Sequence, residues 1–102
     1  MTKAPQIRRE QLRIVRRILH EHLPDGVRVW VFGSRARADN RTWSDLDLAL
    51  EGPEALREDS LIALEEAFER SDLSLRVDLV DLHQVTDRFR RLVEAERKLL
   101  PG

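Results

Sequence analysis

Two aspartates, Asp45 and Asp47, stand two residues apart in the segment DLDLAL, which covers residues 45–50. Because side chains alternate across a strand, the two carboxylates would project from one face and the intervening leucines from the other. Like charges this close are costly to keep ionised unless a cation lies between them. Hard oxygen ligands, in a chain without cysteine, favour Mg²⁺ or Mn²⁺ over zinc. The spacing therefore predicts a divalent-cation site on a strand.

A glycine-serine turn precedes these aspartates. Residues 27–32 alternate valine with other side chains, which predicts a strand that ends at Gly33-Ser34. Gly33 would let the backbone approach a ligand closely. Ser34 would offer a hydroxyl and a backbone N–H at the first turn of a short helix, where phosphate binds well. Turn and aspartates together predict a metal-nucleotide site.

Arginines follow the turn. Arg35 would neutralise a triphosphate, and a solvated charge or a partner for a nearby carboxylate is an equally good interpretation. Arg41 is a weaker candidate for the same role. Trp43 would stack on a nucleobase, although a lone tryptophan is more often a packing residue. We therefore take Arg35 as the candidate nucleotide-binding arginine.

A later apolar segment carries a third aspartate. In residues 75–82, Asp78 alternates with apolar neighbours, which predicts another strand. If the leucine faces of both strands pack on helices, Asp78 emerges with Asp45 and Asp47 on the uncovered side of the sheet. Asp81 has the opposite parity and is interpreted as a turn or cap residue at the strand end.

Helical periodicity surrounds these strands. Amphipathic spacing predicts helices over residues 6–23, from Pro53 through the glutamate-rich segment that follows it, and over 86–100, with Thr86 as an N-cap. The face of the last helix is marked by Phe89, Leu92, Val93, Glu96 and Leu99. The order α-β-β-α-β-α predicts an α+β (α/β two-layer) fold, a small mixed sheet with helices on one face.

Composition excludes several classes of protein. A chain of 102 residues suits a single domain over residues 1–102 with a modest core. Its 18 basic and 19 acidic residues give a net charge of -1, which argues against a general nucleic-acid binder. The absence of cysteine excludes disulfides and thiolate sites, and no apolar run reaches membrane length. Arginines interrupt any signal-peptide core, so a cytoplasmic protein is expected.

The order of these motifs carries a family resemblance. Gly33-Ser34, residues 35–44 and Asp45-Leu46-Asp47 resemble the signature of polymerase-beta-like nucleotidyltransferases, and GSRARA…SDLDL is similar to their minimal form, the MNT domains. The resemblance covers nearly the whole chain, because RVDLVDL supplies Asp78 where those domains place a third catalytic aspartate. Ala38 departs from the glycine of many relatives, at a position that touches no presumed ligand.

The resemblance implies roles for these residues. Asp45, Asp47 and Asp78 would hold two Mg²⁺ ions, with Mn²⁺ as a possible substitute, and would be the catalytic residues. Ser34 and the Gly33 backbone would grip the outer phosphates of ATP. The reaction would move AMP to an acceptor hydroxyl, with pyrophosphate leaving.

The resemblance also implies a partner. Stand-alone MNT proteins resemble the antitoxin half of toxin-antitoxin pairs whose toxin is an all-helical HEPN-type ribonuclease. We therefore expect AMP transfer to a tyrosine hydroxyl of such a toxin, within a hetero-oligomer. Two alternatives stay open: an antitoxin or scaffold that acts by binding alone, and a small-molecule nucleotidyltransferase. The three acidic groups on one face disfavour the first, and the lack of an evident acceptor pocket disfavours the second.

Overall fold

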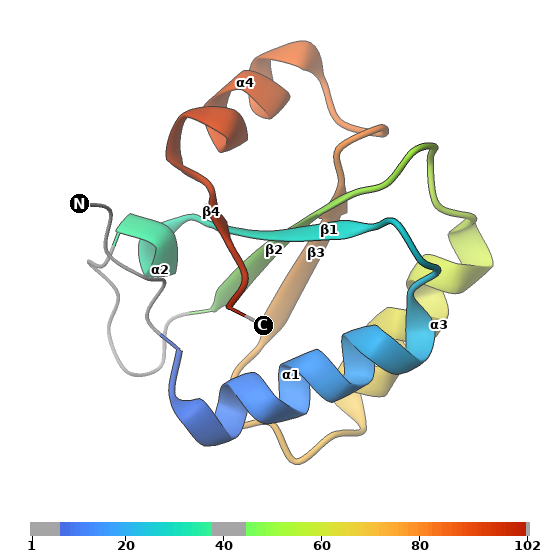
Figure 1. Ribbon diagram of the computed structural model, residues 1–102, viewed down its shortest axis with the longest axis vertical. Helices are drawn as coiled ribbons and strands as arrows, with labels where there is room; N and C mark the ends of the chain where they lie inside the picture. Colours follow the sequence, from blue (N-terminus) through green and yellow to red (C-terminus); the bar gives the residue numbers. More distant parts are fainter. Residues whose placement is uncertain (1–6, 38–44, 102) are drawn as a thin grey trace.

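The computed structural model describes residues 7–37 and 45–101. The sequence candidates Ala38, Arg41 and Trp43 lie outside these ranges. The elements are α1 (Arg9–His22), β1 (Arg28–Phe32), α2 (Ser34–Arg37), β2 (Leu46–Glu51), α3 (Glu58–Glu69), β3 (Val77–Asp81), α4 (Asp87–Glu96) and β4 (Lys98–Leu99) (Figure 1). The predicted order α-β-β-α-β-α is confirmed, with the single helical turn α2 and the two-residue strand β4 in addition.

The four strands form one mixed sheet in the order β3-β2-β1-β4. β1 pairs antiparallel with both β2 and β4, whereas β2 pairs parallel with β3. The parallel pair needs a crossover connection, which α3 provides. Its register places Asp47 beside Asp78, and the antiparallel register places Asp47 beside Phe32 on its other side. The predicted mixed sheet is confirmed.

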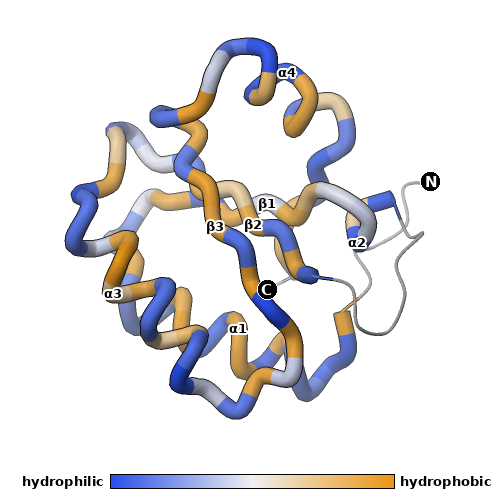
Figure 2. Tube along the Cα trace, turned by 180° about the vertical axis from the view of Figure 1, so that it is seen from behind, coloured by the Kyte–Doolittle hydropathy of each residue, from blue (hydrophilic) through white to orange (hydrophobic). Residues whose placement is uncertain are grey.

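One face of the sheet is covered by α1 and α3. The leucines of β2, Leu46, Leu48 and Leu50, are fully buried on this face. The α1 residues packed against them recur at helical spacing, whereas the arginines of α1 are exposed. Hydrophobic and hydrophilic residues accordingly alternate along the α1 trace (Figure 2). The remaining buried members of this core are Val15, Ile18, Leu19, Val31, Ala36, Leu64, Phe68 and Leu75.

The opposite face is partly covered by α4, which corrects the prediction that all helices lie on one face (Figure 1). Val93 of α4 is fully buried against Phe32, Ala49 and Leu82. The rings of Phe32 and Phe89 meet edge to face with centroids 5.9 Å apart. The physical reason is that the middle of this face, between Asp47 and Glu51, is apolar and needs a cover.

The predicted last helix is also shorter than its periodicity indicated. Thr86 is confirmed as the N-cap, because its side chain accepts a hydrogen bond from Phe89 N at 3.1 Å. The helix ends at Glu96 rather than near residue 100. Lys98 and Leu99 pair instead with the open edge of β1, and Leu100 N donates to Val29 O at 3.0 Å. A partner strand thus outcompetes local helical propensity.

Asp81 is structural, as the sequence predicted. Its side chain accepts hydrogen bonds from Leu56 N at 2.7 Å and from His83 N at 2.9 Å, and the residue is only 3% exposed. It therefore ties the β3 end to the segment before α3, away from the other aspartates. None of the helices in the described ranges is long and apolar enough to cross a membrane.

Candidate functional site

Asp47 and Asp78 form the centre of the candidate site. They are direct neighbours in the parallel pairing of β2 with β3, so both side chains project from the same face of the sheet. Asp45 immediately precedes β2 and is exposed. Its position two residues before Asp47 fits the predicted shared face. The structure thus brings Asp47 and Asp78 together, with Asp45 at the strand entrance.

The protonation of Asp47 reflects this crowding. Partial burial is the main cause that raises its pKa to about 6, and the charges of Asp78, Asp45 and Glu96 act in the same direction. Arg37 opposes them. Burial and the three negative neighbours raise the free energy of the ionised carboxylate, whereas Arg37 lowers it. The carboxylate has lost water without gaining a sufficient counter-charge. A cation bound next to Asp47 would therefore stabilise its ionised form.

Asp78 has a counter-ion of its own. Arg76 Nε lies 3.4 Å from Asp78 Oδ1, but the two side chains are 76% and 43% exposed. An ion pair so open to water contributes little stability and is easily exchanged. Asp78 therefore remains available to a ligand on this face.

Gly33 fits tightly against Asp47. Its φ of +73° lies in the left-handed region that side-chain-bearing residues rarely adopt. A Cβ atom at Gly33 would also collide with Asp47 Oδ2. The sequence suggested that this glycine admits a ligand. The group that it admits in the structure is the carboxylate of Asp47 itself.

The backbone of Gly33 is held by a residue that the sequence analysis missed as a site residue. Gly33 N donates to Glu96 Oε1 at 2.9 Å, and Arg37 NH1 contacts Glu96 Oε2 at 2.9 Å. Glu96 is the acidic member of an otherwise apolar face of α4. That irregularity was the available signal, because a carboxylate on a packing face needs a partner.

Ser34 and Arg35 begin α2 directly after the turn. The Gly33 carbonyl accepts hydrogen bonds from Ala36 N and Arg37 N, both at 3.1 Å, which fixes this single helical turn. Ser34 is partly exposed, whereas Arg35 is only 4% exposed. Burial lowers the pKa of Arg35, and the nearby charge of Asp45 opposes that change. This environment supports the interpretation of Arg35 as a partner for a carboxylate.

The donor set fits a hard divalent cation. Within residues 7–37 and 45–101, no three acidic or histidine side chains are already gathered as a complete metal-ligand group. Mg²⁺ does not need such a group, because it is usually bound by one or two carboxylates together with water and substrate phosphates. Paired aspartates with a raised pKa at Asp47 match that requirement. The arrangement can therefore bind a cation whose remaining ligands come from a phosphate substrate.

Comparison with known proteins points the same way. The family "polymerase beta, nucleotidyltransferase" matches residues 15–101. The chain is 42% identical over 87 residues to the "probable protein adenylyltransferase MntA" of Haemophilus influenzae, which covers 85% of this chain and 75% of that protein.

Two solved structures have a similar fold. One is a toxin-antitoxin with AMP-PNP, with a TM-score of 0.74 and 25% identity over 89% of this chain and 73% of the other. The second is a tri-AMPylated HEPN toxin of Shewanella oneidensis in complex with its MNT antitoxin, with a TM-score of 0.71 and 23% identity over 94% and 73%.

Replacement of Gly33 by alanine tests the fit against Asp47. Gly26→Ala is the matched control, because Gly26 also has a positive φ, +89°, but its added Cβ would meet only Pro53 at 3.9 Å. We expect Gly26→Ala to lower the free energy of unfolding by about 1 kcal/mol through backbone strain. Gly33→Ala should lower it by at least about 1 kcal/mol more, because a clash is added to the strain. Urea unfolding measures both, and equal losses would contradict the fit.

The pH dependence of stability tests the environment of Asp47. Its pKa rises from 3.8 to about 6 on folding, so the folded chain binds the proton more tightly than the unfolded chain. The contribution of Asp47 to the free energy of unfolding is therefore fully present below pH 4 and is lost as the pH rises through 6. In chelator, Asp47→Asn should therefore raise the free energy of unfolding at pH 7.5, by at most about 3 kcal/mol, and change it little at pH 4. An effect independent of pH would contradict this interpretation.

Proposed function

Because this chain belongs to the polymerase beta nucleotidyltransferase family, we propose that it transfers AMP from ATP to a hydroxyl group of a toxin protein, as the antitoxin of a toxin-antitoxin pair. The observation that carries this proposal is the pairing of Asp47 with Asp78, next to the Gly33-Ser34 turn. The relatives support the finer assignment. One is named a protein adenylyltransferase, and the similar complexes contain AMP-PNP or an AMPylated HEPN toxin.

The acidic residues supply the metal ligands in this proposal. Asp45, Asp47 and Asp78 would hold two Mg²⁺ ions, with Mn²⁺ as a substitute. When bound, Mg²⁺ neutralises the triphosphate and stabilises the charge that develops during transfer. Ionised Asp47 is poorly compensated in the metal-free chain, and it would be stabilised by the same event that brings the nucleotide.

The turn supplies the contacts to phosphate. Ser34 presents its hydroxyl and backbone at the partly exposed start of α2. The Gly33 N–H is already donated to Glu96, so Gly33 contributes shape rather than this N–H. Arg35 is buried in the same helical turn near Asp45, so its positive charge would act on the phosphates at longer range and without direct contact. Ser34 and the shape of the turn would bind and orient ATP for attack at its α-phosphorus.

The transfer is a single displacement. The acceptor oxygen, which we assign to a tyrosine hydroxyl, forms a bond to the α-phosphorus. The bond from that phosphorus to the oxygen bridging to the β-phosphate breaks, and pyrophosphate leaves with the electron pair. The hydroxyl proton passes to Asp78, whose side chain is 43% exposed and thus accessible from the acceptor side.

The position of the site suits a protein acceptor. Asp45 is exposed and Asp78 lies on the sheet face beyond the residues that α4 covers. A side chain that projects from a second protein can reach such an open face. We therefore propose a hetero-oligomer with a HEPN-type toxin. A cytoplasmic location belongs to the same proposal, because ATP is the donor.

Intact mass spectrometry tests this function. The HEPN-type protein encoded next to this chain is incubated with the chain, ATP and Mg²⁺, and we expect mass gains in steps of one AMP. Asp45→Asn and Asp47→Asn should each slow the transfer by about a thousandfold or more, because metal ligands act as a unit and the loss of one removes most of the effect of all. Asp72→Asn, at an exposed position before β3, is the matched control and should react at the wild-type rate.

Two outcomes would overturn the proposal. A stable complex without any mass gain would indicate an antitoxin that acts by binding alone. Undiminished transfer by Asp47→Asn would remove the assigned role of the central carboxylate.

A further inference from the structure

Glu96 connects the end of α4 to both ends of α2. Its Oε1 accepts the hydrogen bond from Gly33 N, one residue before α2, and its Oε2 contacts Arg37 NH1 on the last residue of α2, each at 2.9 Å. The side chain of Glu96 is only 19% exposed. Both oxygens of one partly buried carboxylate are thus engaged, which makes the contact stronger than a surface ion pair.

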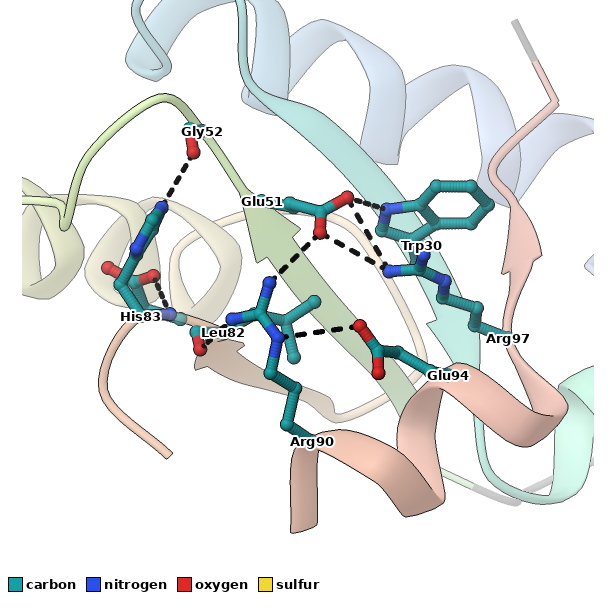
Figure 3. A network of polar contacts seen from close by, with 9 residues as sticks. Trp30, Glu51, Gly52, Leu82, His83, Arg90, Glu94 and Arg97 are labelled. Atoms are coloured by element: carbon teal, nitrogen blue, oxygen red, sulfur yellow. Dashed lines mark hydrogen bonds and ion pairs between the residues drawn. The ribbon is translucent and has the colours of Figure 1, made fainter. Parts of the chain in front are cut away.

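The residue after Glu96 is anchored to the sheet. The guanidinium of Arg97 lies 4.1 Å from the centroid of the Trp30 ring, and its NH1 is 3.4 Å from Glu51 Oε2. Trp30 Nε1 donates to the other oxygen of Glu51 at 3.0 Å, so the three side chains form one network (Figure 3). The chain at Glu96 therefore has a fixed position relative to β1 and β2.

An earlier turn of α4 is anchored to the same carboxylate. Arg90 NH1 donates to Leu82 O at 2.6 Å, and Arg90 NH2 lies 3.3 Å from Glu51 Oε2 (Figure 3). Arg90 also pairs with Glu94 at 3.4 Å. Glu51 thus holds Arg90 of α4 and Arg97 directly after it, so the helix cannot shift along the sheet without breaking part-buried contacts. Glu96 therefore holds the turn at a fixed position relative to the sheet.

The position of this turn also determines the space around Asp47, the central aspartate of the site. Gly33 is packed so closely on Asp47 that a single added carbon would collide with the carboxylate. A displacement of Gly33 thus changes the space open to Asp47. It also moves Ser34, the next residue and the first of α2.

We propose that Glu96 is a positioning residue for nucleotide binding, which clamps the Gly33–Arg37 turn so that Ser34 and Asp47 face the nucleotide together. This inference rests on the proposed function, because it deepens the role of the same site. Glu96 touches none of the reacting groups in this account. It acts through hydrogen-bond geometry, and its negative charge is balanced by Arg37.

Two substitutions at Glu96 separate geometry from charge. Glu96→Gln keeps an oxygen acceptor for Gly33 N, whereas Glu96→Ala removes it. Glu94→Ala is the control on the same helix, because Glu94 contacts Arg90 rather than the turn. The readouts are amide hydrogen exchange of residues 33–37 in the nucleotide-free chain, the Kd for AMP-PNP with Mg²⁺, and KM and kcat for AMP transfer.

We expect Glu96→Ala to speed exchange in residues 33–37 and to raise the Kd by about tenfold, the loss of one charge-assisted hydrogen bond. KM for ATP should rise more than kcat falls. Glu96→Gln should stay within about threefold of wild type, and Glu94→Ala should match it.

The direction of the changes in amide exchange and in the Kd for AMP-PNP decides whether Glu96 positions the turn. Unchanged amide exchange in Glu96→Ala would overturn the proposal. Tighter AMP-PNP binding by both Glu96 variants would also overturn it, because it would show that the Glu96 carboxylate competes with phosphate. If the wild-type chain binds AMP-PNP but transfers no AMP, the proposed function fails while exchange and binding still test Glu96. If the wild-type chain transfers AMP and Glu96→Ala binds equally well, only the role of Glu96 fails.

Discussion

The close contact between the Asp47 carboxylate and Gly33 is the constraint on which the rest of the site depends. It requires a residue without a side chain at position 33, in a left-handed conformation. It also leaves Asp47 partly desolvated among Asp78, Asp45 and Glu96, which raises its pKa. Such an environment destabilises the ionised carboxylate, and a bound cation would offset the lost water and the neighbouring negative charges. The surrounding core must therefore supply the stability that the site does not.

The sheet supplies this stability through apolar cores on both of its faces. One face of β2 consists of fully buried leucines covered by α1 and α3. The other face is divided along its length, with α4 packed over Phe32 and Ala49 and the aspartates beyond it. The helix that covers this face also carries Glu96, so the element that closes the second core also fixes the turn. Packing and site geometry thus share one helix.

Much of this arrangement could be predicted from alternation alone. The two-residue spacing of Asp45 and Asp47 against leucines indicated which face of β2 is buried, and the same parity selected Asp78 over Asp81. These predictions succeed because strand parity is a local property. The site roles of the three aspartates, Ser34 and Arg35 remain predictions that the proposed experiments test.

The missed features depend on contacts distant in sequence. Lys98 and Leu99 continue a helical pattern, and only the free edge of β1 makes them a strand. Glu96 appeared as one more residue on an amphipathic face, although its partner Gly33 is 63 positions away. The single-face prediction failed because apolar residues such as Phe32 and Ala49 alternate with the leucine face and form a second, smaller core. Local periodicity does not contain such pairings.

The most direct test of this account is an NMR titration of the Asp47 side-chain carboxyl carbon, first in chelator and then with Mg²⁺ and AMP-PNP. We expect a pKa of about 6 for Asp47 in the metal-free chain. When the cation and nucleotide bind, this pKa should fall below the ordinary value of 3.8, since a bound cation favours the ionised form. An ordinary pKa in the metal-free chain, or a raised pKa unchanged by Mg²⁺ and nucleotide, would contradict it.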